Sequence, residues 1–328
     1  NPCGVGTLEN TDTAKGRTMA SARPSYIRAL CATGLVMASM IWATPSLAQD
    51  QPALPDYVVE EFGTPPAIPT GPLSADVQAA VEVAFVDGMA QNSWGQAQTS
   101  ALVTIAESKD PRLAWVISDM MRFVRGPDLN VILTGAASEL LGKTFSTTNS
   151  WGVVTDHLMA WDIPAPPDYL RLKRVIFTSI VPGWDKIFVT GDIDWRLVSW
   201  GGVLIDARPY DTTDEPCNCI PAADNPKVTS ASEATWLKDD DIVFGIEVNG
   251  ETRAYPRRIM EVREMVNDTL GGRDLGIPYC TLCGAAQAYF TDELPEGIER
   301  PILRTSGLLI RSNKVMYDVV TYSVFDTF

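Results

Sequence analysis

Apolar residues recur every three or four positions through the first half of the chain, which is the spacing of a buried helix face. One such segment follows Ser74, a favoured N-cap residue. Another follows Asp110-Pro111, an N-cap residue with proline at the first helical position. The pattern predicts six helices, one that starts at residue 74 and others over residues 94–107, 111–124, 128–141, 151–161 and 169–180.

The first four predicted helices are short and are joined by corners such as Asp110-Pro111 and Gly126-Pro127-Asp128. Short helix pairs with corners of this kind are typical of α-solenoids, so we predict a HEAT-like helical domain over residues 74–199. A plain helical bundle is the alternative arrangement. His157 lies at helical spacing from Trp161, and a lone histidine on such a face is interpreted as a packed core residue.

From residue 200 onward the pattern changes to short apolar runs separated by turn residues, as expected for strands. Asn249-Gly250 is a two-residue turn sequence that predicts a β-hairpin between residues 242–248 and 251–255. A short helix is predicted over residues 256–266. The fold class is therefore α+β, a helical N-terminal region followed by a mostly antiparallel β-rich domain over residues 200–328, with further strands at residues 275–279, 285–290, 302–305, 308–311 and 315–318.

The sequence before the helices has the character of an export signal. Arg23 and Arg28 precede an uncharged apolar run, and Ser46-Leu-Ala48 supplies the small residues of a cleavage site. We predict a secretory signal peptide over residues 19–48 and a periplasmic or secreted protein. Residues 1–18 are interpreted as upstream non-structural sequence, and the proline-rich residues 49–73 as an extended linker.

The charge of the chain narrows the class of partner. Its 328 residues include 26 Lys and Arg against 41 Asp and Glu, a formal net charge of −15. Such a surface repels nucleic acid, so no nucleic-acid partner is expected. No segment after the signal has the length and apolarity of a membrane span. The expected partner is another exported protein, bound through the helical region.

The candidate chemistry lies in four cysteines that follow the signal. Cys217-Asn-Cys219 falls in a polar loop, and Cys280-Thr-Leu-Cys283 ends an apolar strand. Two close thiolate pairs suit an all-cysteine zinc site or a softer copper(I) site. Cys280 and Cys283 also suit a redox dithiol. The very small ring that Cys217 and Cys219 would close together predicts that any structural disulfide joins one pair to the other.

We predict a metal site with Cys217, Cys219, Cys280 and Cys283 as ligands to zinc or copper. A thiol–disulfide redox protein and a disulfide-stabilised binding module are the two alternatives. Haem is not expected, because Gly284 stands where covalent attachment needs histidine. No nucleotide is expected either, because the chain has no P-loop or dinucleotide fingerprint. A histidine-rich catalytic zinc site is excluded by the single histidine.

Polar residues of the β-rich region supply further candidates. Glu261 and Glu264 are three positions apart on the predicted helix, which suits hard metal ligands, an acid–base pair or a solvated charged face. Arginine and asparagine side chains on the short strands suit a pocket for an anion. The pocket candidates are Arg253, Tyr255, Glu264, Asn267, Asp268, Arg304, Ser306, Arg311 and Asn313.

Several of these residues belong to motifs that occur together: Arg253-Ala-Tyr-Pro256, Glu264-Met-Val-Asn267-Asp268, Gly271-Gly-Arg273, Tyr279-Cys-Thr-Leu-Cys283-Gly284, and Arg304-Thr-Ser-Gly307 with Arg311-Ser-Asn313. In combination they resemble the bacterial and archaeal domain-of-unknown-function family numbered 3179, over roughly residues 200–328. The stretch from Ile220 to Pro226 resembles the entry segment of that family.

The resemblance implies a protein that is often exported and to which no reaction is assigned. It also implies a domain that continues past residue 328, so the C-terminal domain is expected to be truncated. Many members of the family carry histidine where this chain has Arg263. A metal held by that histidine in those members would need a different ligand here.

Overall fold

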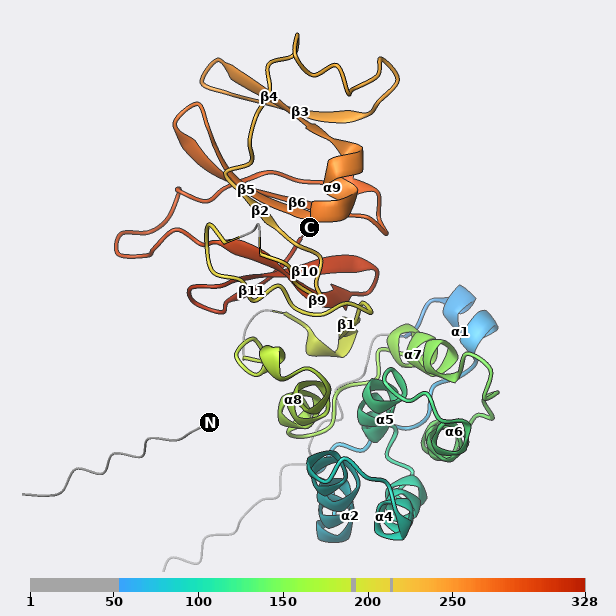
Figure 1. Cartoon of the computed structure of the whole chain (residues 1–328). Coiled ribbons are helices and arrows are strands. Elements are labelled where there is room, and N and C mark those ends of the chain that lie inside the picture. The colour runs from blue at the N-terminus through green and yellow to red at the C-terminus, as the bar shows by residue number, and fades with distance from the viewer. Residues whose placement is uncertain (1–52, 190–192, 213–214, 328) are drawn as a thin grey trace, which may run out of the picture. The chain divides into compact units, whose positions relative to one another are not determined.

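The computed structural model (Figure 1) describes residues 53–189, 193–212 and 215–327, which belong to one unit, Asp50–Phe328. The predicted signal peptide and the sequence before it lie outside the described residues. Helices occupy the first part and antiparallel sheets the second, which confirms the α+β class. The helices are α1 (Asp56–Phe62), α2 (Ala75–Val81), η1 (Glu82–Asp87), α3 (Gly88–Ala90), α4 (Gln96–Glu107), η2 (Pro111–Leu113), α5 (Ala114–Met121), α6 (Pro127–Leu141), α7 (Ser150–Ala160), α8 (Tyr169–Ile180), η3 (Pro182–Trp184), η4 (Trp195–Leu197) and α9 (Arg257–Arg263).

The helix starts read from the sequence are confirmed by their caps. The Ser74 hydroxyl accepts a hydrogen bond from the Val77 amide at 3.4 Å, and the Asp110 carboxylate accepts one from the Arg112 amide at 3.1 Å. These side chains satisfy amide groups that the first turn leaves without a helical partner. Helix α6 ends at Gly142, whose φ of 63° is the left-handed conformation that glycine adopts without strain.

Part of the predicted linker is helical. Residues 56–62 form α1 instead of an extended arm, with Pro55 at its N-cap. Val58 is buried, and Leu54 and Phe62 pack against the main core. The proline count favoured an extended chain, but burial of this apolar face stabilises one short helix in it.

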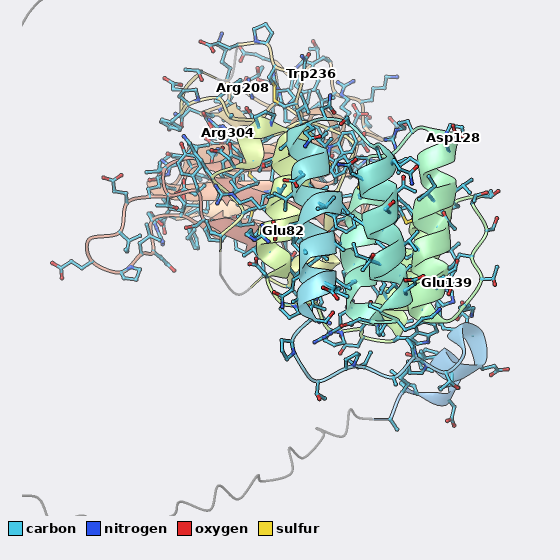
Figure 2. All side chains as sticks on the ribbon, turned by 90° about the horizontal axis from the view of Figure 1, so that it is seen from below. Glu82, Asp128, Glu139, Arg208, Trp236 and Arg304 are labelled. Atoms are coloured by element: carbon cyan, nitrogen blue, oxygen red, sulfur yellow. A yellow bond between two sulfur atoms is a disulfide. The ribbon has the colours of Figure 1, made fainter. Side chains whose placement is uncertain are left out.

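Helix α5 lies at the centre of the helical region, where it contacts α6, α7 and α8 (Figure 1). All of its residues are buried, and the Trp115 indole donates to the Ile163 carbonyl at 2.7 Å. Figure 2 shows α2, α4 and α6 side by side, with the labelled Asp128 and Glu139 near the two ends of α6. A central helix surrounded by others describes a bundle. The structure does not confirm a HEAT-like repeat, which stays a prediction.

The strands form three antiparallel groups with one parallel pairing, between β2 and β5. One sheet has the order β1-β9-β10-β11, a second has the order β2-β5-β6-β7 with β8 also on β6, and β3 and β4 form the predicted hairpin. Their bounds are β1 (Val198–Trp200), β2 (Ala223–Asp224), β3 (Val243–Val248), β4 (Glu251–Pro256), β5 (Met265–Leu270), β6 (Arg273–Cys280), β7 (Ala285–Ala286), β8 (Tyr289–Phe290), β9 (Leu303–Ile310), β10 (Asn313–Asp318) and β11 (Val324–Asp326).

Two sequence-based boundaries in this region are wrong. The helix predicted to residue 266 ends at Arg263, and Glu264 leaves it with a φ of 52°. Asn267 and Asp268, which were expected at the helix end, lie within strand β5. Most of β5 is buried on both faces, and such a run has no alternation to separate it from a helix. The two strands predicted over residues 302–305 and 308–311 are one strand, β9.

The main apolar core joins the helices to the first sheet. Val198, Leu308 and Tyr317 belong to the same cluster of buried residues as the helices, and the Trp184 indole donates to the Ser306 carbonyl at 2.7 Å. A second cluster lies between α9, the β3–β4 hairpin and the sheet that contains β6. Within the described ranges, no helix has the length and apolarity needed to cross a membrane.

Candidate functional site

The Cys-x-x-Cys sequence forms a turn at the end of a buried strand. Cys280 is the last residue of β6 and pairs with Ala285 of β7, so the chain reverses over the four residues between them. Gly284 closes the turn with a φ of 64°, in the left-handed region that favours glycine. Cys280 is 2% exposed and Cys283 is at the surface, with both thiols free.

The two sulfurs of this turn lie 2.9 Å apart. An S–S bond is about 2.05 Å long, so disulfide formation requires them to approach by less than about 1 Å. Both thiols also contact one carbonyl oxygen, that of Ser312 in the turn between β9 and β10, at 3.5 Å from Cys280 and 3.2 Å from Cys283. The Asn313 side-chain oxygen lies 3.8 Å from the Cys283 sulfur.

A buried ion pair lies beside the turn. The Lys314 ammonium donates to the backbone carbonyl of Glu264 at 2.9 Å and to its carboxylate, while the Thr281 hydroxyl donates to the other carboxylate oxygen. The side chain of Lys314 is 5% exposed and that of Glu264 is 13% exposed. Burial lowers the pKa of Lys314, whereas Glu264 and a thiolate at Cys280 act in the opposite direction.

The accessible thiol of the turn is held in its protonated form. Burial of the sulfur, its hydrogen bond with Cys280 and the charge of that neighbour raise the pKa of Cys283 to about 11. A thiol with so high a pKa is mostly uncharged at neutral pH. The reduced form of this site therefore gains little stability from thiolate formation, in contrast to oxidising dithiols with depressed pKa values.

The second cysteine pair is already closed. Cys217 and Cys219 form a disulfide, with their Cα atoms 5.2 Å apart. The prediction that structural disulfides join one pair to the other is therefore wrong. The chain bends at Asn218, which brings the two Cα atoms within the separation that disulfides tolerate and lets the small ring close.

The four sulfurs do not form one cluster. In the described part of the chain, the group of potential ligands within 4.8 Å of one another consists of Asp206, Cys217 and Cys219, without the other cysteines. The Asp206 carboxylate accepts hydrogen bonds from the Arg208 guanidinium at 2.7 Å and from the Ala222 amide at 2.9 Å. The geometry is compatible with a metal only after reduction of the disulfide, because thiolates are the ligands.

Two pocket candidates, Arg304 and Asn267, belong instead to a buried network. The Arg304 guanidinium makes a bidentate ion pair with Asp224, at 2.8 and 2.6 Å. The Asn267 amide donates to Asp224 and to the Leu303 carbonyl, which joins the two sheets. Figure 2 shows Arg304 near Arg208. Full burial leaves no open face for a ligand, so these residues stabilise the fold.

Three further candidates meet at one carboxylate. The Asp268 side chain accepts from the Arg253 guanidinium at 2.6 Å and from the Tyr255 hydroxyl at 2.8 Å, which links the hairpin to strand β5. Burial, and then the hydrogen bond with Asp268, raise the pKa of Tyr255 above its ordinary range. The tyrosine is consequently a hydrogen-bond donor and not a proton source at neutral pH.

The remaining candidates are split between structure and surface. The buried Ser306 hydroxyl donates to the Val315 carbonyl at 2.5 Å, a structural contact. Arg311 is exposed and lines a cavity of about 200 Å³ next to α5 and α7. Ser312 lines the same cavity, and because its carbonyl contacts both thiols, the cavity adjoins the dithiol turn. His157 is a buried packing residue, as expected, with its Nδ1 atom 2.7 Å from the Val153 carbonyl oxygen.

Sequence reasoning missed Lys314, Thr281 and Ser312. Lys314 directly precedes the apolar run that was predicted as a strand, and a lysine inside a buried strand needs a partner. That break in the apolar pattern was the available signal. Nothing in the sequence indicated that Glu264, far away along the chain, would be that partner.

Among comparisons with known proteins, a match is found in the β-rich region. Neither the search of curated proteins nor the search of solved structures yields a match. A match to a family profile starts at Cys217, includes both cysteine pairs, the Lys314–Glu264 pair and strands β2 to β11, and excludes the helical region. Residues 217–328 match the family described as protein of unknown function, DUF3179.

Proposed function

We propose that this is an exported thiol–disulfide exchange protein in which Cys280 and Cys283 cycle between dithiol and disulfide. The observation that carries the proposal is the pair of free sulfurs 2.9 Å apart, one buried and one at the surface of a turn. Exchange needs one sulfur that a substrate can reach and a second that can resolve the mixed disulfide. The turn provides both.

In the proposed reaction the Cys283 thiol, which is protonated at neutral pH, first releases its proton to water, and the resulting thiolate attacks one sulfur of a substrate disulfide. The substrate S–S bond breaks, a mixed disulfide forms at Cys283, and the first substrate sulfur leaves and takes up a proton. Cys280 then loses its proton and attacks the Cys283 sulfur, which releases the second substrate thiol and forms the Cys280–Cys283 bond. Two electrons and two protons pass from the dithiol to the substrate.

The Lys314–Glu264 pair has a role at the second step. Cys280 is buried, so its proton has no direct path to bulk water, and the positive charge of Lys314, which interacts with that of Cys280, would stabilise the thiolate that attacks. A buried lysine with a lowered pKa also exchanges a proton more readily than an ordinary lysine. The Thr281 hydroxyl donates to the Glu264 carboxylate and fixes it, and the Glu264 main-chain carbonyl accepts from the Lys314 ammonium, so both contacts position that ammonium.

The test is a redox titration of the purified chain in dithiothreitol buffers, with maleimide trapping and mass spectrometry of the peptides. We expect one two-electron transition at Cys280 and Cys283. Its potential should lie nearer the about −270 mV of thioredoxin than the about −120 mV of DsbA, because the reduced thiols are not stabilised as thiolates. A pair that stays reduced, or stays oxidised, across the whole series contradicts exchange.

Two variants make the assignment specific. Replacement of Cys217 and Cys219 by serine should leave the transition in place, because that disulfide is a separate site. Replacement of Cys280 alone should abolish the two-electron transition and leave Cys283 able to form only mixed disulfides.

Export is supported by the signal-peptide pattern over residues 19–48 and by the disulfide at Cys217 and Cys219, which suits an oxidising compartment. The substrate would then be another exported protein or a small disulfide outside the cytoplasm. A fusion of residues 19–48 to alkaline phosphatase tests this, since the enzyme is active only after export. An inactive fusion that is made in full contradicts export of this chain.

A metal site at Asp206, Cys217 and Cys219 is a second candidate, supported by their mutual distances within 4.8 Å. The bidentate Arg208 and the Arg304 Nε atom, 3.9 Å away, already neutralise the Asp206 carboxylate and would compete with a cation. The test is zinc or copper(I) content after anaerobic reduction and desalting. Retention of less than about a tenth of an equivalent, or equal retention after replacement of both cysteines by serine, contradicts this site.

A further inference from the structure

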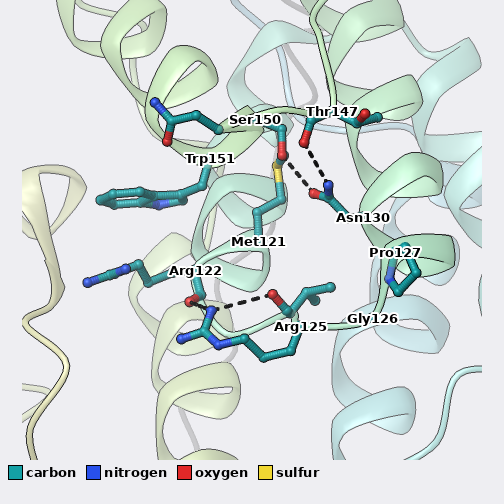
Figure 3. A pocket seen from close by; sticks show the side chains of 11 residues that line it. Met121, Arg122, Arg125, Gly126, Pro127, Asn130, Thr147, Ser150 and Trp151 are labelled. Atoms are coloured by element: carbon teal, nitrogen blue, oxygen red, sulfur yellow. Dashed lines mark hydrogen bonds between the residues drawn. The ribbon is translucent and has the colours of Figure 1, made fainter.

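A cavity of about 430 Å³ lies in the helical region, and no cysteine of the described residues lines it (Figure 3). It is bordered by the end of α5 and the starts of α6 and α7. Arg122 and Arg125 form one side in Figure 3, and Asn130, Thr147 and Ser150 form the other. The Asn130 side-chain amide donates to the Thr147 carbonyl at 3.0 Å, and the Ser150 hydroxyl donates to the Asn130 side-chain oxygen at 2.6 Å, and these two bonds fix that second side.

The cavity is lined by two cations and by no acidic side chain. This is unusual in a chain of net charge −15, in which Arg112, Arg208 and Arg304 each have a carboxylate partner. Asp128 is the acidic residue closest to the cavity in sequence, and it does not line it. An uncompensated pair of positive charges in a concave site favours an anionic ligand.

Protein contacts hold both guanidinium groups in place and leave some of their N–H groups without a partner in the described part of the chain. Arg122 donates through Nε to the Trp200 carbonyl at 2.8 Å and stacks on the Trp151 ring, 4.5 Å from its centroid. Arg125 donates through Nη1 to the Arg122 carbonyl at 3.3 Å and the Val124 carbonyl at 3.5 Å. The Nη1 and Nη2 groups of Arg122 and the Nε and Nη2 groups of Arg125 have no hydrogen-bond partner among the described residues.

Two further observations indicate that the cavity favours a negatively charged ligand. Burial and the charge of Arg125 lower the pKa of Arg122, so the protein itself does not compensate this guanidinium. The N-terminal ends of α6 and α7, at Pro127 and Ser150, also border the cavity, and neither has a side-chain cap. Helix N-termini add a favourable potential for negative charge, although they do not define the site.

We infer that this cavity binds the oxyanion group of a small molecule, through bidentate contacts from Arg122 and Arg125. Planar guanidiniums match the paired oxygens of carboxylates and phosphates. The volume falls in the range of small-molecule sites and is larger than an inorganic phosphate needs. The ligand class is therefore an organic phosphate or a polycarboxylate. The inference does not depend on the proposed redox activity.

Isothermal titration of the full chain with inorganic phosphate and with citrate tests the site. We expect saturable binding that weakens with added sodium chloride, because the contacts are between charges. Tighter binding of citrate would identify the ligand as a polycarboxylate, and tighter binding of phosphate would identify it as a phosphate ester. Absence of saturable binding for both probes at low ionic strength overturns the inference.

The variants are Arg125→Gln, Arg122→Lys and, as the matched control, Arg174→Gln. Arg125 and Arg174 are both exposed, so each glutamine removes one charge without disturbing the core, and only Arg125 lines the cavity. Loss of one charge-assisted contact should weaken binding about tenfold in Arg125→Gln and leave Arg174→Gln unchanged. Arg122→Lys keeps the charge but loses the planar fork, and intermediate affinity is expected. Equal weakening in Arg125→Gln and Arg174→Gln also overturns the inference.

Discussion

The two cysteine pairs of this chain have nearly the same spacing and opposite states. Cys217 and Cys219 are closed into a disulfide beside a buried carboxylate that two arginines neutralise. Cys280 and Cys283 are open, one at the surface, beside a lysine. The comparison teaches that the number of residues between two cysteines does not decide their chemistry. The exposure of each sulfur and the ions nearby differ between the two pairs.

The ion networks next to the two cysteine pairs also differ in their exposure to solvent. The Asp206, Asp224 and Arg304 side chains are fully buried and have no open face. Lys314 and Glu264 border a turn that a substrate can approach, and their ion pair keeps some exposure. The first network therefore serves stability, and the second lies beside the turn at which the proposed exchange would take place.

Arg304→Met should lower the free energy of unfolding by about 3–5 kcal/mol, because it leaves the buried Asp224 carboxylate without its bidentate partner. Urea unfolding followed by circular dichroism measures the change. The exposed Arg311→Met is the control and should stay within about 0.5 kcal/mol of the parent. Equal effects of the two substitutions would show that the Arg304 network is not a stability element.

Lys314→Met should lower the free energy of unfolding by about 2 kcal/mol, because the largely buried Glu264 carboxylate loses its charged partner and keeps Thr281. Addition of Glu264→Gln should restore part of the loss, since it removes the unpaired charge. Resolution of a mixed disulfide at Cys283 should also slow, measured by stopped-flow release of a chromophoric thiol. An unchanged release rate would assign the pair to stability alone.

Replacement of Cys217 and Cys219 together by serine should cost about 1.5 kcal/mol, the chain-entropy value for so small a ring. The redox transition of the other pair should not move in the same variant. A shift of that transition would mean that the two pairs are coupled, contrary to the comparison above.

Alkylation of Cys283 by iodoacetamide should be slow at neutral pH, and its rate should increase with pH with a midpoint at about 11. The unfolded chain in urea should instead show a midpoint near about 8.5, the ordinary value for cysteine. Because the folded pKa is the higher one, the contribution of this thiol to stability is present below about pH 8.5 and is lost as pH rises through about 11. In Cys280→Ala the midpoint should fall, since the hydrogen bond and charge of Cys280 are gone. A folded-state midpoint already near about 8.5 contradicts the proposed protonated state.

Local features of the structure were predictable from the sequence. The caps at Ser74 and Asp110 and the Asn249-Gly250 turn depend on neighbours a few positions away, and the structure confirms all three. The position of Cys280 at the end of an apolar strand is confirmed for the same reason. Residue type and short-range spacing carry that information.

Other features depended on contacts between distant segments. Strand β5 was misread because burial on both faces removes the alternation by which a strand is recognised. Arg304 and Asn267 were grouped with possible ligands because a polar residue in a motif does not reveal that its partner is another side chain. Their contacts with Asp224 span 80 and 43 positions along the chain.

Residue types and short-range spacing were enough to predict the class of the fold, the helix caps at Ser74 and Asp110, the hairpin and the four cysteines as the residues of interest. Which cysteines pair, which stay free and what surrounds them follows from contacts in the folded chain. Cys217 closes on Cys219, while β10 brings Lys314 to Glu264 and places the Ser312 carbonyl against both thiols of the other pair. The physical reason is that redox chemistry depends on burial and neighbouring charge, which arise only when segments far apart in sequence pack together.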